Sequence, residues 1–390
     1  MGAPAISISV VEQPHRAKRG AWRRFDWLLQ LITVLLIVLG EVMIYSSYEA
    51  SFAASGQPLM ENTLFRQSLF ALAGIVLSLL LAMVDYHVLV RLWRWVYLVA
   101  LLSLGVVLGI GFTSFGAQSW VDVELFGVQP SELAKMLMLL VLSHWLGREG
   151  KGLEGAGPFL LSGLLIIPPV ILIYLQPDFG TALILTAMWV CMAYVSGVRF
   201  RHLLVLVVGG AALAPMIWFQ MDDYMRERII TFFLPGDDPS GASYNINQAL
   251  ISIGSGGFWG KGFMHGTQSQ LHFLRVRHTD FIFSVFAEEF GFVGSLLLIG
   301  LFAALILRLF RIAAQAPDAQ GRLLAAGVGA MIFVQAFINI GMNANLLPVT
   351  GLPLPLVSYG GSSLITTLLA LGIAQSVAMR RGGDASMSLE

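Results

Sequence analysis

Long apolar runs alternate with short polar connections along most of the chain. A helix needs roughly 20 mostly apolar residues to cross the hydrocarbon of a bilayer. The runs are apolar throughout and lack the alternation of membrane-barrel strands. They therefore predict an all-α polytopic integral membrane protein with about ten transmembrane helices, near 26–46, 64–84, 93–112, 130–147, 158–176, 178–196, 202–219, 280–308, 322–345 and 358–378.

Composition narrows the class in the same direction. The 390 residues are 57% hydrophobic and 12% charged, with a net charge of zero, whereas soluble domains are about 25% charged. A disordered chain would be richer in charge and poorer in apolar residues, and a nucleic-acid binder would carry a basic excess. Cys191 is the single cysteine, which excludes a disulfide scaffold.

The basic residues predict the orientation. With the N-terminus inside, sixteen Lys and Arg residues fall in cytoplasmic tails and loops, and Arg66 alone falls in a short outer loop. This asymmetry follows the positive-inside rule and places both termini in the cytoplasm. The domains are then a cytoplasmic tail at 1–25, a membrane domain at 26–381 and a second tail at 382–390.

One connection, residues 220–279, is far longer than the others and lies outside the cell in this topology. Long connections in compact domains are usually functional or disordered. This one is rich in aromatic and aliphatic residues, and residues 246–253 are expected to form a short helix. We therefore expect a large ordered extracytoplasmic loop.

Ionisable residues at membrane depth are costly and mark functional sites. Glu132 and Lys135 follow Pro130 in the fourth predicted span, three residues apart on one helix face. They form either an internal ion pair that fixes packing or a charged wall of a cavity that opens outward. Asp178 precedes the sixth span, where it caps the helix or faces the same cavity.

Asp280 begins the eighth span, directly after Arg275, Arg277 and His278. It is either an ordinary N-cap or an ionised carboxylate that acts as a base at an aqueous mouth. Glu288 lies two turns deeper, near the face of Asp280, and Glu289 is about 100° away on the helix. We expect at least one of these glutamates to pair internally.

Two glycine-rich stretches have a structural and a functional interpretation. Gly360 and Gly361 precede the last helix, where small residues favour helix packing or expose amides to an anion such as pyrophosphate. Residues 254–262 resemble a phosphate-binding loop but lack its Ser or Thr. We interpret them as a turn that presents Lys261.

The candidate charges lie at one level near the outer leaflet: Glu132, Lys135, Asp178, Arg226, Arg228, Lys261 and Asp280. A transporter would place its site near the midplane. The pattern favours a one-sided site that acts on a molecule in or on the outer leaflet, without naming the substrate. We predict no metal site built by His265, His272 and His278, because their spacing does not support one.

A set of motifs in order then resembles the SEDS family of shape, elongation, division and sporulation proteins. The resemblance extends over residues 26–381, and the run at 265–270 favours its RodA branch over its FtsW branch. The motifs that carry it are Pro130-Ser131-Glu132-Leu133-Ala134-Lys135, Gln176-Pro177-Asp178, 254–262, His265-Gly266-Thr267-Gln268-Ser269-Gln270, His278-Thr279-Asp280-Phe281-Ile282-Phe283 and Ser358-Tyr359-Gly360-Gly361-Ser362-Ser363.

The resemblance implies a peptidoglycan glycosyltransferase of the bacterial cytoplasmic membrane. Such an enzyme polymerises lipid II into β-1,4 glycan strands at the outer face during cell elongation and releases undecaprenyl pyrophosphate. Asp280 matches the family's essential acid and is assigned as the catalytic base. The expected substrate-binding residues are Glu132, Lys135, Asp178, Arg226, Arg228, Lys261, His278, Ser358, Gly360 and Gly361.

The resemblance also sets expectations for cofactor and partner. Glu132 and Asp178 would shape the cavity or hold a divalent cation, Mg²⁺ or Mn²⁺; whether a cation is needed stays open. Besides membrane lipids, lipid II and the nascent glycan, the expected partner is a class B penicillin-binding protein, a transpeptidase; no nucleic acid is expected. The competing hypotheses are a lipid II flippase or other lipid transporter, and a scaffold with vestigial catalytic residues.

Overall fold

Each of the ten predicted spans is a helix in the structure. The computed structural model describes residues 22–52, 62–114, 117–123, 126–147, 156–221, 223–233, 242–271, 273–274 and 278–381. The helices that match the ten runs are α2 (Trp27–Phe52), α3 (Thr63–Met83), α5 (Trp93–Ile110), α6 (Pro130–Leu146), α7 (Ala156–Tyr174), α8 (Phe179–Val195), α9 (Phe200–Gln220), α13 (Ile282–Ala314), α14 (Ala319–Asn343) and α15 (Gly361–Met379).

The lengths of these helices agree with a membrane protein. Among the described helices, α2, α3, α13, α14 and α15 are long and apolar enough to cross a bilayer. Shorter apolar segments lie in α5, α7, α8 and α9. The remaining helix of this set, α6, has 17 residues and carries the buried Glu132 and Lys135.

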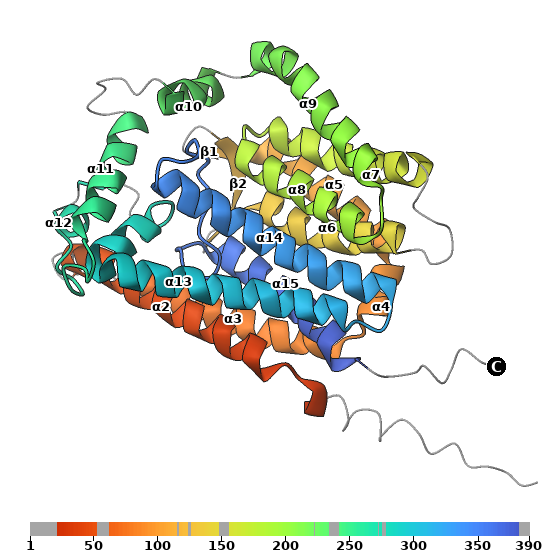
Figure 1. Ribbon diagram of the computed structural model, residues 1–390, viewed down its shortest axis with the longest axis horizontal. Helices are drawn as coiled ribbons and strands as arrows, with labels where there is room; N and C mark the ends of the chain where they lie inside the picture. The colour runs from red at the N-terminus through yellow and green to blue at the C-terminus, as the bar shows by residue number, and fades with distance from the viewer. Residues whose placement is uncertain are drawn as a thin grey trace, which may run out of the picture.

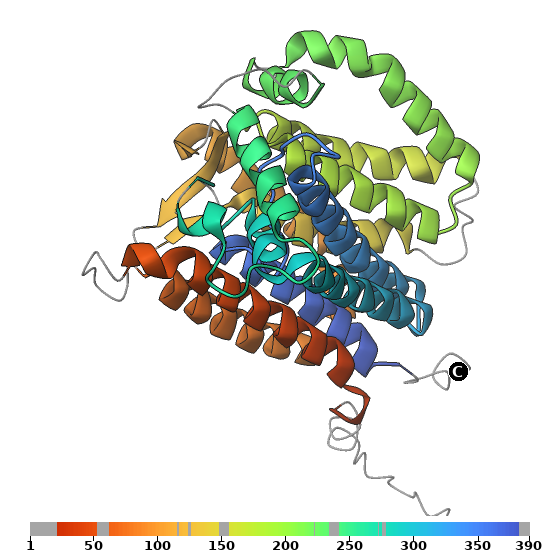
Figure 2. The same ribbon diagram turned by 60° about the vertical axis from the view of Figure 1, so that its left-hand side comes forward.

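Two helices form the centre of the bundle (Figure 1). α15 packs against α3, α14 and α6, while α14 also packs against α13, α8 and α6. α2 and α3 cover one side, and α5, α7 and α8 lie on the other (Figure 2). α9 leans away from the bundle and keeps its main contact with α8.

A small antiparallel sheet joins α5 to α6 and adds strands to the predicted all-helical fold. Its order is β1 (Phe112–Ser114), β2 (Ala117–Val123) and β3 (Phe126–Val128), with Val121 opposite Val128. The strands are rich in Phe, Thr, Trp and Val, which suit pleated structure. The sheet delivers the chain to Pro130 at the start of α6.

One end of the bundle holds both ends of the described chain and several ion pairs. The 3₁₀ turn η1 (Trp22–Arg24) contacts α15, so both ends of the described chain lie together, as the predicted topology requires. There Asp26 accepts two bonds from Arg308 Nε, both at 2.9 Å, and its Oδ2 lies 3.4 Å from Arg381. The short helix α4 (Tyr86–Arg91) is tied to Asp318 by His87 Nε2 at 3.0 Å.

The described residues of the long outer connection form three helices, α10 (Asp223–Phe233), α11 (Ala242–Ser255) and α12 (Thr267–Gln270). α11 contains the predicted helix at 246–253, so that prediction is confirmed. These helices lie at the end of the bundle opposite the described chain ends (Figure 1).

The glycine-rich stretch after α11 is inserted into a break in α13. The break is at Gly291, with φ +65°, and Gly260 opposite it has φ +82°. A Cβ on Gly260 would collide with the carbonyl of Glu289, so only glycine allows this approach. The two segments pair through their main chains: Lys261 N to Glu288 O at 3.0 Å, Gly262 N to Glu289 O at 2.9 Å and Phe292 N to Gly257 O at 2.9 Å.

Candidate functional site

Asp280 lies in the turn that leads into α13 and is partly buried. The N-cap of α13 is Phe281, and no side chain caps that helix. The capping interpretation of Asp280 is therefore wrong: its carboxylate is not used to satisfy the helix start. The backbone of Asp280 is held instead, because its carbonyl accepts from Asn339 Nδ2 at 3.0 Å and from Asn343 Nδ2 at 2.9 Å.

Burial sets the protonation of this carboxylate. It raises the pKa of Asp280 from 3.8 to about 6, although the Arg228 guanidinium and a hydrogen bond from Thr279 lower the pKa in the opposite direction. Desolvation penalises the ionised form, and a nearby cation favours it. A carboxylate with this pKa is mostly ionised at neutral pH and accepts a proton more readily than an ordinary aspartate.

Arg228 on α10 is a cation whose charge acts on this carboxylate, and both groups lie close to Gly351. A Cβ built on Gly351 would lie 3.6 Å from Arg228 Nη1 and 3.7 Å from Asp280 Oδ2. Gly351 has φ +71°, a conformation that disfavours side chains. The Arg228 guanidinium also donates to Val349 O at 3.3 Å. The turn at 349–351 therefore lies against both charged groups.

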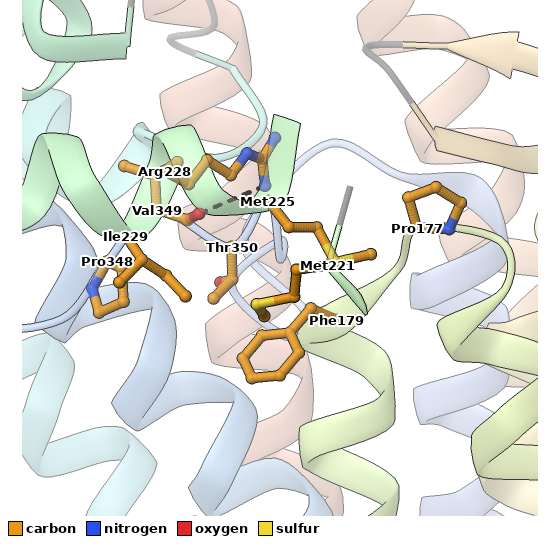
Figure 3. Close-up of a pocket in the computed structure, with 9 residues that line it drawn as sticks. All are labelled: Pro177, Phe179, Met221, Met225, Arg228, Ile229, Pro348, Val349 and Thr350. Carbon is orange, nitrogen blue, oxygen red and sulfur yellow. Dashed lines mark hydrogen bonds between the residues drawn. The ribbon is translucent and has the colours of Figure 1, made fainter. Parts of the chain in front are cut away.

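A small apolar pocket of about 30 Å³ lies beside Arg228 (Figure 3). Pro177 and Phe179 form one wall at the start of α8, and Met221 after α9 forms another with residues of α10. The lining residues are Pro177, Phe179, Met221, Met225, Arg228, Ile229, Pro348, Val349 and Thr350. A guanidinium among apolar side chains suits an amphiphile with an anionic head.

His278 and Ser358 hold the two chain segments of the mouth together. Ser358 Oγ donates to Thr279 O at 2.6 Å and accepts from Leu354 N at 2.8 Å. Tyr359 N donates to His278 O at 2.9 Å, and the two rings lie 5.8 Å apart. These bonds connect the turn of Asp280 to the segment before α15. The structure gives both predicted residues a role in shaping the mouth; substrate contact by either one stays a prediction.

The carboxylate of Asp178 accepts hydrogen bonds from nearby groups. It is the N-cap of α8, where it accepts from Thr181 N at 3.0 Å. Its Oδ2 also accepts from Gln129 Nε2 at 3.1 Å and from Ser131 Oγ at 3.2 Å. The capping interpretation of Asp178 is confirmed. Burial raises the pKa of Asp178, while the bonds from Thr181 lower it.

Glu132 and Lys135 form an internal ion pair. Lys135 Nζ lies 2.8 Å from Glu132 Oε1, and the side chains are 2% and 1% exposed. Lys135 also donates to Gln335 Oε1 on α14 at 3.0 Å. The structural interpretation of the pair is therefore confirmed. Its charges act on Asp178, so these three candidates form one cluster at the starts of α6 and α8.

Arg226 and Lys261 have partners outside the mouth. Arg226 donates to the carbonyls of Trp218 at 3.0 Å and Phe219 at 2.7 Å, at the end of α9. The Lys261 side chain is 27% exposed, and its ammonium pairs with the fully buried Glu288 at 2.8 Å. Glu288 also accepts from Thr267 N at 2.8 Å. The predicted internal pairing of a glutamate is confirmed, and substrate binding by Arg226 or Lys261 stays a prediction.

Gly360 and Gly361 serve helix packing in the structure. The Gly360 N–H donates to Gln67 Oε1 at 3.3 Å, and Gln67 Nε2 donates to Ser358 O at 3.3 Å. A Cβ on Gly361 would come within 2.6 Å of the Phe70 ring. α3 therefore approaches the start of α15 closely. Anion binding by these two residues stays a prediction.

The residues proposed for a divalent cation do not fit one. Glu132 Oε1 is bonded to an ammonium group and Asp178 accepts three donors, so neither carboxylate is open to a metal. Within the described part of the chain no group of three His, Cys, Asp or Glu could hold a metal ion. His272, Arg275 and Arg277 lie outside the described residues. We derive no chemical step through a cation.

Several residues of the site were missed at the sequence level. Asn339 and Asn343 hold the Asp280 carbonyl, and Gln335 stands one turn before them on the same helix. Their spacing of four residues in an apolar span was the available signal, because it places them on one face. Gln67, which bridges Ser358 and Gly360, gave no such signal.

The chain resembles known proteins along most of its length. Residues 26–382 match the model of the FtsW/RodA/SpoVE cell cycle proteins. It is 41% identical over 354 residues to the peptidoglycan glycosyltransferase MrdB of Escherichia coli, with 90% of this chain and 93% of the relative covered. It is 35% identical to the stage V sporulation protein E of Bacillus subtilis, with 90% and 96% covered.

Solved structures agree with these similarities. A chain from a peptidoglycan synthase complex, described for its coordination of polymerization and crosslinking, matches with a TM-score of 0.78 at 35% identity, covering 92% of this chain and 99% of that one. The rod shape determining protein RodA of Thermus thermophilus matches with a TM-score of 0.68 at 34% identity, covering 93% and 99%.

Proposed function

The chain belongs to the FtsW/RodA/SpoVE family of cell cycle proteins, and we infer that it is a peptidoglycan glycosyltransferase of the bacterial cytoplasmic membrane. It polymerises lipid II into β-1,4 glycan at the outer face and releases undecaprenyl pyrophosphate. The observation that carries this inference is the Asp280 carboxylate, which caps no helix and stands beside Arg228 at the outer mouth.

The reaction requires one base and stabilisation of a leaving group. The acceptor hydroxyl attacks the anomeric carbon of the donor, and the bond from that carbon to the diphosphate oxygen breaks. The transition state resembles an oxocarbenium ion. The hydroxyl proton passes to Asp280, which supplies general-base help of roughly 10²–10⁴-fold.

Arg228 stabilises the departing diphosphate. Fixed positive charge at the point where negative charge develops lowers the barrier. The apolar side chains around Arg228 support the same assignment, since they would contact the first part of the lipid chain while the guanidinium holds the anionic head. Asp178, Glu132 and Lys135 would support this mouth by fixing the starts of α6 and α8.

The partner of this reaction is a class B penicillin-binding protein that crosslinks the new strands. The relative from a complex that coordinates polymerization and crosslinking supports this assignment. Both activities act on one product, so a polymerase and a transpeptidase in one complex would process the strand as it forms.

The decisive experiment combines the purified protein, its transpeptidase partner and lipid II, with the product resolved on a gel. We expect glycan polymer from the wild type and none from Asp280→Ala. No polymer from wild type, or equal polymer from both, would contradict the inference. Dye quenching of labelled lipid II in proteoliposomes tests the flippase alternative, which predicts transport that does not depend on Asp280.

A further inference from the structure

Three buried carboxamides form a row along the face of α14 that points to the mouth. Gln335, Asn339 and Asn343 are 1%, 0% and 0% exposed, and their spacing of four residues keeps them on one face. Buried amides are costly unless they are hydrogen-bonded. Gln335 Nε2 donates to Pro353 O at 3.1 Å and Asn339 Nδ2 donates to Leu352 O at 2.7 Å, so the row holds the loop before α15.

Asn343, the last carboxamide of the row along α14, lies at the start of α13. In a regular helix the N–H of Ser284 would donate to the carbonyl of Asp280, four residues earlier. Here the carboxamide of Asn343 stands between these two groups. Its Nδ2 donates to Asp280 O at 2.9 Å, and its Oδ1 accepts from Ser284 N at 3.2 Å and from Ser284 Oγ at 2.5 Å.

The inserted carboxamide has a direct consequence for Asp280. The Asn343 carboxamide bridges Asp280 O and Ser284 N, and Ser284 N also donates to Phe281 O at 3.1 Å, so α13 begins after Asp280. Asn339 Nδ2 donates to the Asp280 carbonyl at 3.0 Å, so both lone pairs of that oxygen are occupied. Without Asn343, the bond from Ser284 N to Asp280 O could close, and the carboxylate would move to a capping position at the helix start.

We propose that Asn343, supported by Asn339, is a positioning residue that keeps Asp280 outside α13 and its carboxylate beside Arg228 and Gly351. This inference rests on the proposed function, in which Asp280 is the base. Asn343 itself touches no substrate; it acts through the backbone of Asp280.

Gln375 on α15 provides a matched control. It is also a buried carboxamide in a central helix, 3% exposed, and within the described residues its Nε2 and Oε1 have no hydrogen-bond partner. Gln375→Leu and Asn343→Leu therefore each remove a buried carboxamide from a central helix. The carboxamide of Asn343 bonds Asp280, Ser284 and Asn339, whereas that of Gln375 bonds none of the described residues.

The experiment measures kcat and KM for lipid II with the wild type and the variants Asn343→Leu, Asn343→Ser and Gln375→Leu, each in complex with the transpeptidase partner. Since displacement of a catalytic group by about 1 Å can cost 10²-fold, we expect Asn343→Leu to lower kcat about 100-fold and leave KM within threefold. The short side chain of Asn343→Ser cannot span both groups, and we expect a loss of about tenfold. Gln375→Leu should stay within about twofold of wild type.

A pH series separates positioning from simple loss of structure. If Asp280 moves to a capping position, its carboxylate gains bonds from backbone N–H groups, which lower its pKa, and leaves Arg228, whose charge also lowers it. The acid limb of the rate profile should therefore shift in Asn343→Leu and remain in place in Gln375→Leu. Arg228 and the titratable His278 are unchanged in all variants.

Equal kcat and an unchanged acid limb in Asn343→Leu and Gln375→Leu would overturn the proposal. If Asn343→Leu does not yield folded protein by melting temperature in detergent, Asn343→Ser is judged by the same two criteria. Polymer from the wild type together with normal Asn343 variants overturns the positioning role alone. Absence of polymer from the wild type overturns the proposed function and this inference with it.

Discussion

The outer starts of α8 and α13 both follow an aspartate, and the two helices use it in opposite ways. Asp178 caps α8 and accepts three hydrogen bonds from Thr181, Gln129 and Ser131. Asp280 caps nothing; its backbone carbonyl is held by two asparagines while its carboxylate faces Arg228. The carboxylate of Asp178 thus stabilises a helix start. At the start of α13, side-chain amides from α14 bind the backbone instead, and the carboxylate of Asp280 stays free of that structural role.

The comparison shows how an acid is kept available for chemistry. A carboxylate at a helix start tends to bind the free N–H groups there. The Asn343 carboxamide bridges the Asp280 carbonyl and the Ser284 N–H at the start of α13, so the carboxylate is not drawn into the helix. The largest differences between the two aspartates should therefore appear in activity, and smaller ones in stability.

The strongest test of the comparison replaces each aspartate by asparagine. Asp280→Asn loses the base, and we expect polymerisation to fall by roughly 10²–10⁴-fold. Asp178→Asn keeps a good N-cap and should retain activity within a few-fold. Both are measured as initial rates of glycan formation from lipid II. A similar loss in both variants would mean that the two acids do not differ in role.

Removing the cation should give the next largest effect. Arg228→Gln takes away the charge beside Asp280 and the diphosphate, and we expect the rate to fall about 10–100-fold. Because Arg228 lowers the pKa of Asp280, the acid limb of the pH profile should also move to higher pH. Arg226→Gln is the control, since Arg226 binds carbonyls at the end of α9. A larger loss in the control would contradict the assignment.

The pH dependence of the wild type should follow the raised pKa. Asp280 must be ionised to accept a proton, and its pKa is about 6. We expect the rate to be about tenfold lower at pH 5 than at pH 7.5, with the midpoint near 6. The measurement is kcat from pH 4.5 to 8 at saturating lipid II. A rate that stays constant down to pH 4.5 would show that a group of ordinary acidity controls the step.

Replacing the two aspartates should change the stability of the folded protein in opposite directions. The pKa of Asp280 is higher in the folded state than its ordinary value of 3.8, so the stability linked to this group is greatest below that value and is lost as pH rises through about 6. At pH 7.5, Asp280→Asn removes this cost and should stabilise the protein by about 1 kcal/mol, allowing for partial exposure.

Asp178→Ala should have the opposite effect, because it leaves three donors without their acceptor and the helix without its cap. We expect a loss of about 1–2 kcal/mol. Both variants are compared by melting temperature in the same detergent at pH 7.5. A drop for Asp280→Asn would indicate that its carboxylate has a stabilising role in the folded state.

Much of the fold follows from apolar length alone. All ten spans begin and end near the predicted residues, because roughly 20 apolar residues have few alternatives to a membrane helix. The Glu132–Lys135 pair could also be predicted from the sequence, since a spacing of three residues on a helix brings the two side chains together. The orientation followed from the basic residues of the short loops.

The rest depends on contacts between segments far apart in the chain. A sequence motif cannot show whether an aspartate or a distant amide satisfies a helix start, and Asn343 lies 63 residues from Asp280. The insertion of Gly260 beside Gly291 is likewise invisible in either segment alone. The sheet before α6 was missed because its strands are short and lie between two apolar runs.

The break in α13 also bears on how the protein is made. Residues 257–262 emerge from the ribosome before α13, yet their main-chain partners are Glu288, Glu289, Phe292 and Val293. Until α13 arrives, the outer loop cannot adopt its final form, and until the loop pairs with it, polar backbone at the break lacks partners in the bilayer. The two must mature together, so the helix that begins beside Asp280 is completed only when the extracytoplasmic loop has closed on it. Biogenesis thereby delays the assembly of the catalytic mouth until more than two thirds of the polypeptide has been translated.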